Sequence, residues 1–192
     1  MKVQKMLKSL MSAVGVAWVM TSSVFAANVA KIGDTEYATI DAAIAAWKPG
    51  EMIELLSDIE RDSYFVFTQN TYALDGKGHT IKCTKAHSKS WKYFVNANAG
   101  TQTFKNIIID GNGKVPFVMQ AIDGGKLILE NVTIKGAKTT TTGSLFSRST
   151  SLGYGIHVND GSVEAKNITI TNCEVADVYQ DGASSSFTLS GG

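Results

Sequence analysis

The sequence predicts an all-β protein wound into a right-handed parallel β-helix, a solenoid in which successive turns of the chain lie side by side. Two observations predict this fold. A short motif of alternating apolar and polar residues recurs along the chain, and an asparagine occupies the same place in each copy. A hairpin and a helical segment with an apolar stripe precede the repeats, as expected of a cap over the open end of a solenoid.

Three copies of the motif, residues 100–109, 125–134 and 161–170, align at offsets of 25 and 36 residues. Four positions in each copy are expected to point inward, and eleven of these twelve residues are apolar. Because they alternate with mostly polar residues, each copy predicts strands with one buried face. The predicted inward residues are Gln102, Phe104, Ile107, Ile109, Leu127, Leu129, Val132, Ile134, Val163, Ala165, Ile168 and Ile170.

The alternation shifts by one residue at the asparagine of each copy. A straight strand cannot absorb this shift, because its apolar residues would turn to the other face. Asparagine tolerates left-handed backbone angles, so we expect a corner at Asn106, Asn131 and Asn167. In stacked copies the three side chains would form a structural ladder of hydrogen bonds. An antiparallel β-sandwich is the alternative fold, but it does not require the same corner residue in every copy.

A third strand per turn is predicted at residues 93–97, 117–122 and 154–158, each followed by a glycine-containing turn. A fourth, looser copy at 72–78 aligns with 107–113 at an offset of 35, which places Asp75 at the position of Asp110. Right-handed winding follows from the general rule for crossovers between parallel strands.

Residues 1–26 have the layout of a secretory signal peptide, with three lysines, an apolar run and small residues before a predicted cut after Ala26. The apolar run is about half of the ~20 residues that span a bilayer. We therefore expect an exported, extracellular or cell-surface protein with no membrane span in the mature chain. Without the signal peptide, 15 basic and 17 acidic residues give a net charge of −2, which offers no reason to expect nucleic acid as a partner.

Residues 27–50 are expected to form the N-terminal cap, with a hairpin around Gly33-Asp34-Thr35. Thr39 can cap a helix over 40–47, which ends before Pro49-Gly50. Residues 51–192 then form the β-helix. A last strand begins at Phe187 and no cap follows it, so we expect a fragment of a longer protein.

No set of residues predicts catalysis, a metal site or a cofactor. Cys83 and Cys173 are too few for a disulfide framework and are expected to be free, buried side chains. The histidines, at 79, 87 and 157, have no zinc-ligand spacing. Asp75 and Asp110 stand in Asp-Gly-x-Gly turns, where aspartate commonly binds its own backbone, and Asp123 and Asp160 lie near matching turns.

Two insertions are candidates for binding. The first is locally basic with interleaved aromatic residues, and Lys89, Trp91, Lys92 and Tyr93 are its candidate ligand-binding residues. Stacking and charge suit an anionic glycan, whereas the alternative is a solvated loop with Trp91 packed against the β-helix. The second, 139–153, is rich in Ser and Thr and explains the longer offset between repeats; it is either a functional loop or a tolerated insertion.

The stretch 30–58 resembles the N-terminal cap of many bacterial surface proteins with β-helix repeats. Leu74-Asp-Gly-Lys-Gly-His-Thr-Ile81 resembles the first-turn motif of the pectin-lyase-like superfamily. The resemblance covers nearly all of the mature chain and implies the fold more than an activity, because the superfamily includes lyases, hydrolases, esterases, phage tailspikes and adhesins. The Asn-Thr-Asp, Asp-Asp and Gly-His-Gly elements of a polygalacturonase-like hydrolase are absent, and no acidic cluster surrounds Arg61 or Arg148 as in a pectate-lyase-like site.

These observations favour a non-enzymatic secreted or surface segment, adhesin-like or stalk-like, that binds extracellular polysaccharide or a host surface. The alternative is a fragment of a polysaccharide lyase or glycoside hydrolase acting on acidic polysaccharide, with its catalytic turns beyond residue 192.

Overall fold

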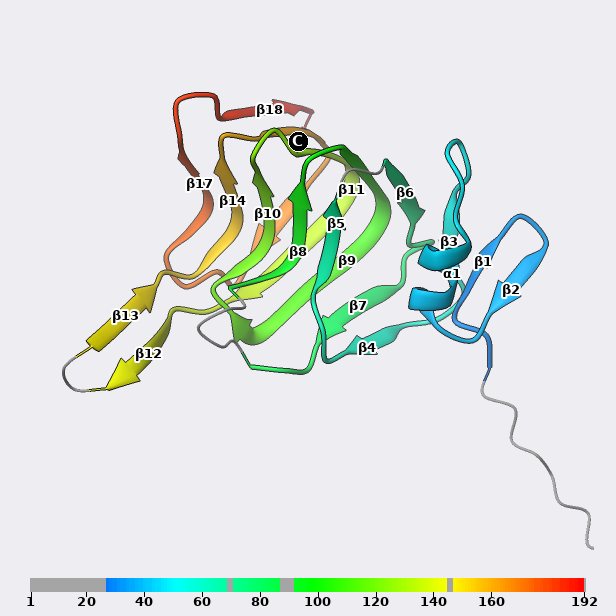
Figure 1. Cartoon of the computed structure of the whole chain (residues 1–192), viewed down its shortest axis with the longest axis horizontal. Helices are drawn as coiled ribbons and strands as arrows, with labels where there is room; N and C mark the ends of the chain where they lie inside the picture. Colours follow the sequence, from blue (N-terminus) through cyan, green and yellow to red (C-terminus); the bar gives the residue numbers. More distant parts are fainter. Residues whose placement is uncertain (1–26, 69–70, 87–91, 145–146, 192) are drawn as a thin grey trace, which may run out of the picture.

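In a computed structural model that describes residues 27–68, 71–86, 92–144 and 147–191, the protein is mainly β, with 61% strand and one short helix. Figure 1 shows two large sheets and a small projecting hairpin. The predicted signal peptide, 1–26, lies outside the described residues. Among the residues that are described, no helix is long and apolar enough to cross a membrane.

The larger sheet has eleven strands and the second has five. Every pairing described in these two sheets is parallel, except that β1 pairs antiparallel with β2 and with β3. The larger sheet contains β1 (Ala30–Ile32), β2 (Thr35–Tyr37), β3 (Ile53–Leu55), β4 (Ile59–Arg61), β6 (Tyr72–Asp75), β7 (Thr80–Cys83), β9 (Thr101–Val115), β11 (Lys126–Ala137), β15 (Ser162–Lys166), β16 (Thr169–Thr171) and β18 (Ser186–Ser190). Parallel pairing rules out the antiparallel sandwich.

The five-stranded sheet has the order β17-β14-β10-β8-β5. From β8 onward the chain alternates between the two large sheets, and side chains from both lie in one hydrophobic core. The strands predicted at 93–97, 117–122 and 154–158 are β8, β10 and β14. The sheet contains β5 (Phe65–Thr68), β8 (Tyr93–Asn98), β10 (Phe117–Ile122), β14 (Tyr154–Asn159) and β17 (Ala176–Asp181).

The alignment of the three motif copies is confirmed by the strand register. Leu127 of β11 pairs with Gln102 of β9 and with Val163 of β15, and Ile134 pairs with Ile109 and Ile170. Ten of the twelve predicted inward residues are buried, and the other two, Ile168 and Ile170, are partly buried against the core. The period-two pattern therefore identified the buried face correctly.

The alignment predicted for the fourth copy is wrong. Leu74 pairs with Phe104, an offset of 30, and Thr80 pairs with Ile108, an offset of 28. Asp75 therefore lies beside Lys105, and Asp110 lies beside Lys82. The predicted alignment matched Asp75-Gly-Lys-Gly78 with Asp110-Gly-Asn-Gly113 and so placed β6 beside the second half of β9, whereas β6 pairs with the first half. The offset then falls from 30 to 28 because the connection between β6 and β7, residues 76–79, has two more residues than the corresponding corner in β9.

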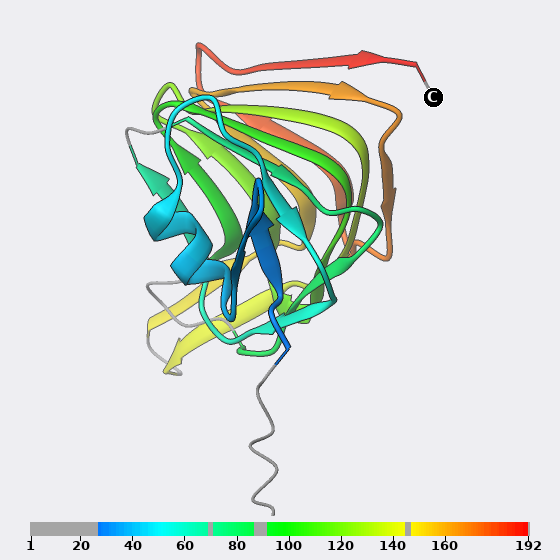
Figure 2. The same cartoon turned by 90° about the vertical axis from the view of Figure 1, so that its right-hand side faces the viewer.

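The predicted hairpin and helix precede these strands. Strands β1 and β2 form the hairpin, and helix α1 (Ile40–Ala46) begins after Thr39, whose side chain accepts a hydrogen bond from the Ala42 amide at 3.2 Å. The helix ends one residue earlier than predicted, because Trp47 is extended. Trp47 packs on Tyr72 with a ring-centroid distance of 4.7 Å. Figures 1 and 2 show α1 and the hairpin together at one end of the sheets.

The Ser/Thr-rich insertion is a second antiparallel hairpin, formed by β12 (Thr140–Ser144) and β13 (Ser147–Ser151). The sequence predicted only an excursion here. Threonine is β-branched and favours strands, so the four threonines at 139–142 are the sequence signal for the first of these strands. The hairpin projects from the body of the protein (Figure 1).

Candidate functional site

The three corner asparagines form a row of hydrogen-bonded side chains. Asn106, Asn131 and Asn167 have φ angles of 48°, 54° and 52°, in the left-handed region. Asn131 Nδ2 donates to Asn106 Oδ1 at 3.0 Å, and Asn167 Nδ2 donates to Asn131 Oδ1 at 3.2 Å. Asn131 and Asn167 also begin Asn-x-Thr sequences, but their amide nitrogens are engaged in this row.

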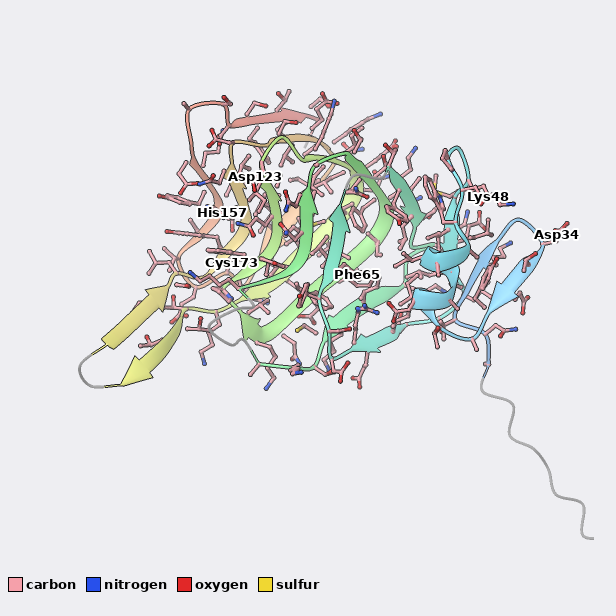
Figure 3. All side chains as sticks on the ribbon, viewed as in Figure 1. Asp34, Lys48, Phe65, Asp123, His157 and Cys173 are labelled. Atoms are coloured by element: carbon pink, nitrogen blue, oxygen red, sulfur yellow. The ribbon has the colours of Figure 1, made fainter. Side chains whose placement is uncertain are left out.

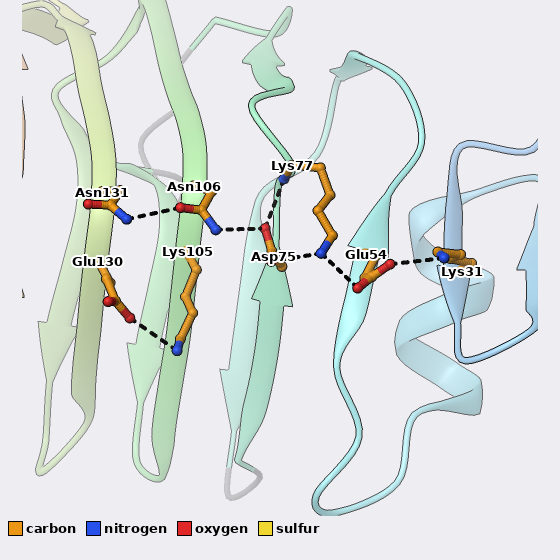
Figure 4. A network of polar contacts seen from close by, with 8 residues as sticks. All are labelled: Lys31, Glu54, Asp75, Lys77, Lys105, Asn106, Glu130 and Asn131. Atoms are coloured by element: carbon orange, nitrogen blue, oxygen red, sulfur yellow. Dashed lines mark hydrogen bonds and ion pairs between the residues drawn. The ribbon is translucent and has the colours of Figure 1, made fainter.

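Charged residues extend the row toward the N-terminal hairpin (Figure 4). Asn106 Nδ2 donates to Asp75 Oδ1 at 3.1 Å, and Lys77 Nζ lies 3.1 Å from Asp75 Oδ2 and 2.8 Å from Glu54 Oε1. Glu54 also pairs with Lys31 at 3.0 Å. Burial acts to raise the pKa of Asp75, but hydrogen bonds from the Lys77 amide, Asn106 and Lys77 Nζ outweigh it and lower the pKa.

The aspartates that were candidates for a catalytic role form hydrogen bonds with the backbone at turns. Asp75 Oδ1 accepts from the Lys77 amide at 2.9 Å, and Asp110 Oδ1 accepts from the Asn112 amide at 2.7 Å. Asp160 Oδ1 accepts from the Ser184 amide at 3.0 Å. Asp75 and Asp110 therefore stabilise their own turns, whereas Asp160 connects its turn to the later turn that contains Ser184.

Only part of the predicted ligand-binding segment is described. Lys89 and Trp91 lie outside the described residues, as does His87. Lys92 is exposed, and Tyr93 begins β8 with its side chain half-buried. Tyr93 belongs to a row of aromatic side chains that crosses the five-stranded sheet.

This aromatic row consists of Tyr64, Tyr93, Phe117, Tyr154 and Tyr179. Phe117 pairs in register with Tyr93 on one side and Tyr154 on the other. The rings of Tyr64 and Tyr93 meet edge to face at 5.4 Å, whereas Phe117 and Tyr154, and Tyr154 and Tyr179, stack at 5.9 and 4.6 Å. Tyr64 and Tyr179, at the two ends, are 41% and 39% exposed. The row therefore presents exposed rings at both ends.

A row of polar side chains runs beside the aromatic row. Asn96, Gln120 and His157 are register neighbours on β8, β10 and β14, with exposed fractions of 2%, 7% and 7%. Buried apolar residues precede and follow each of them in the strand, so these three point away from the core. The Phe117 ring lies 4.5 Å from the His157 ring and helps to bury it.

His157 connects this polar row to the edge strand β17. Its Nδ1 lies 2.8 Å from Gln120 Nε2, and its Nε2 lies 2.9 Å from Asp181 Oδ1. Asn159 Nδ2 donates to the same Asp181 oxygen at 2.8 Å. We call Asn96, Gln120, His157 and Asp181 the polar row. Figure 3 shows Phe65 and His157 toward opposite edges of the five-stranded sheet.

The environment sets what the polar row can do chemically. Burial lowers the pKa of His157, and the Asp181 carboxylate opposes this effect. Both ring nitrogens have partners, so the imidazole has no free nitrogen with which to act as a general base. Nothing in the sequence singles out His157. The third predicted strand of each turn, however, has an aromatic residue at 93, 117 or 154, and this recurrence is a signal for the aromatic row.

The two cysteines are free. Cys83 is buried, and burial raises its pKa to about 11, whereas Cys173 is only half-buried, contrary to expectation. Within the described part of the chain, no group of three His, Cys, Asp or Glu side chains could hold a metal ion.

Comparison of the chain with protein-family models, with curated proteins and with solved structures finds no match.

Proposed function

We propose that the chain is a segment of a right-handed parallel β-helix related to the pectin-lyase-like superfamily. Three features support the proposal: the alternation of the chain between two parallel sheets, the register of the motif copies, and the asparagine at each corner. Each passage from one large sheet to the other and back is then one turn of the solenoid. The helix α1 and the hairpin β1–β2 act as its N-terminal cap.

We further propose that this β-helix is secreted or displayed at the cell surface as a non-enzymatic adhesin-like or stalk-like segment. The supporting observation is that charged side chains outside the core pair between neighbouring strands. Lys105 and Glu130 lie 3.1 Å apart, Lys126 and Glu164 lie 2.6 Å apart, and Lys135 lies 3.4 Å from Asp110. These charges connect successive turns instead of converging on a pocket, as suits a structural element.

The partner we propose is an extracellular polysaccharide or a glycan of a host surface. The exposed rings at the ends of the aromatic row support this choice, because aromatic side chains combine a large apolar face with a polar group. Lys92 adds an exposed positive charge next to Tyr93.

The test is binding of the full chain to immobilised polygalacturonate, together with an assay for unsaturated or reducing ends released from it. We expect binding without turnover. Tyr179→Ala should weaken binding by about 2- to 10-fold, from the ~0.5–1.5 kcal/mol worth of one aromatic contact. Val175→Ala is the matched control, because Val175 is also exposed but lies outside the aromatic row. Sustained release of sugar ends would contradict the non-enzymatic function.

A further inference from the structure

Two acceptors in the polar row are buried without a hydrogen-bond partner. They are Asn96 Oδ1 and Gln120 Oε1, which belong to register neighbours on adjacent strands. Buried polar atoms normally have partners, because an unpaired group loses its hydration and gains nothing in return. Two unpaired acceptors side by side therefore indicate that another arrangement of this row satisfies them.

The orientation of the Gln120 amide fixes the protonation of His157. A Gln120 nitrogen that donates to His157 Nδ1 requires this nitrogen to be unprotonated. The proton of the neutral ring is then on Nε2, which donates to Asp181 Oδ1. In this state the Gln120 oxygen points away from His157 and has no partner.

We propose that the polar row is a proton-linked hydrogen-bond chain in which the Gln120 amide reverses when His157 takes up a proton. In the imidazolium both ring nitrogens donate. Rotation of the amide by about 180° presents Gln120 Oε1 to Nδ1–H and turns Nε2 toward Asn96 Oδ1 on the neighbouring strand, ~4.8 Å away. One rotation thus supplies a donor to each unpaired acceptor.

The hydrogen-bond chain would extend beyond Gln120 and beyond His157. Asn96 is hydrogen-bonded to the Tyr93 hydroxyl, and the protonated ring keeps its bond to Asp181. The hydrogen bonds would then run in one direction from His157 to Tyr93. Bonds aligned in this way strengthen one another in a low-dielectric environment.

Among the described residues that contact His157, Asp181 carries an opposite charge. Strand β17 presents Asp181 and the Tyr179 ring, β10 presents the uncharged Phe117 and Gln120, and Tyr154 precedes His157 on its own strand. Asp181 therefore opposes the burial that disfavours the charged ring.

Acidification strengthens the link between β14 and β17, and thus fixes Tyr179 at the exposed end of the aromatic row. As regulation of glycan binding this inference rests on the proposed function, but its test needs no glycan.

The test is a pH titration of the full chain by ¹⁵N NMR, which follows the His157 ring nitrogens and the side-chain amides of Gln120 and Asn96. We expect His157 Nδ1 to gain a proton at the same midpoint at which both amide signals shift. The proposal is overturned if His157 gains a proton while the Gln120 and Asn96 amides stay unchanged, or if His157 stays neutral until the protein unfolds in acid.

A variant distinguishes the proposed hydrogen-bond chain from a simple hydrogen-bonded pair of His157 and Asp181. Asn96→Ala removes the acceptor for the reversed amide, two strands away from His157, and should lower the His157 midpoint by about half a pH unit or more. Asn98→Ala is the matched control on the same strand, outside the polar row, and should leave the midpoint unchanged. Equal midpoints for Asn96→Ala and the unmodified chain would overturn the proposal. The titration of the unmodified chain decides the question if either variant fails to fold.

Discussion

Asn131 donates its side-chain amide to Asn106 Oδ1 at 3.0 Å, although 25 residues separate the two in the chain. Both residues have a left-handed backbone. The same side chain thus makes the corner possible and connects one copy of the motif to the next. Conformation and hydrogen bonding can be tested separately at this position.

Asn131→Ala should lower the free energy of unfolding by about 2–4 kcal/mol, because it removes two side-chain hydrogen bonds and places a Cβ-bearing residue at positive φ. Asn131→Gly removes the same bonds but accepts positive φ, so it should cost only about 1–2 kcal/mol. Urea denaturation measures both. Equal losses for the two variants would show that the left-handed corner contributes nothing.

Two neighbouring glycines should respond differently to alanine. A Cβ at Gly125 would lie 2.1 Å from the carbonyl oxygen of Ala97, whereas a Cβ at Gly124 would meet no atom within 4 Å. Gly125→Ala should therefore cost more than about 3 kcal/mol, because backbone must move. Gly124→Ala, at φ +80°, should cost about 1–2 kcal/mol from backbone strain alone. Thermal denaturation compares them, and a larger loss for Gly124→Ala would contradict the packing at this turn.

Acid should destabilise the protein partly through Asp75. The folded state lowers the pKa of this carboxyl group, so its contribution is present above the unfolded pKa of about 3.9 and is lost as the pH falls through the folded value. Asp75→Asn should reduce the stability at neutral pH and flatten its decline in acid. Denaturation at a series of pH values measures this. Asp34→Asn, at the exposed turn of the N-terminal hairpin, serves as control, and an unchanged acid decline in Asp75→Asn would contradict the role given to Asp75.

The features that were predicted from sequence are those that each motif copy carries within itself. The alternation of apolar and polar residues around Asn131 identifies both the buried residues and the corner, because both are determined by residues within the same short motif. The fourth copy was misaligned because its Asp-Gly-x-Gly sequence at 75–78 matches 110–113, which placed β6 beside the wrong half of β9.

The polar row could not be predicted because its members come from four strands. Asn96, Gln120 and His157 share no residue type, and only the register places them side by side. Their burial depends on rings such as Phe117, which belong to another position of the repeat. A search for identical residues at fixed offsets finds the asparagine ladder and passes over this mixed row.

The central claim is that the three motif copies lie side by side in the order of the chain, and disulfide formation tests it directly. Glu130 pairs in register with Lys105 on one side and Lys166 on the other. With Cys83 and Cys173 replaced by serine, Glu130→Cys combined with Lys166→Cys should form a disulfide under mild oxidation, because neighbouring strands lie ~4.8 Å apart. Lys105→Cys combined with Lys166→Cys should not, because the two strands are ~10 Å apart. A disulfide in the second pair and none in the first would contradict the side-by-side order on which the ladder and the proposed β-helix depend.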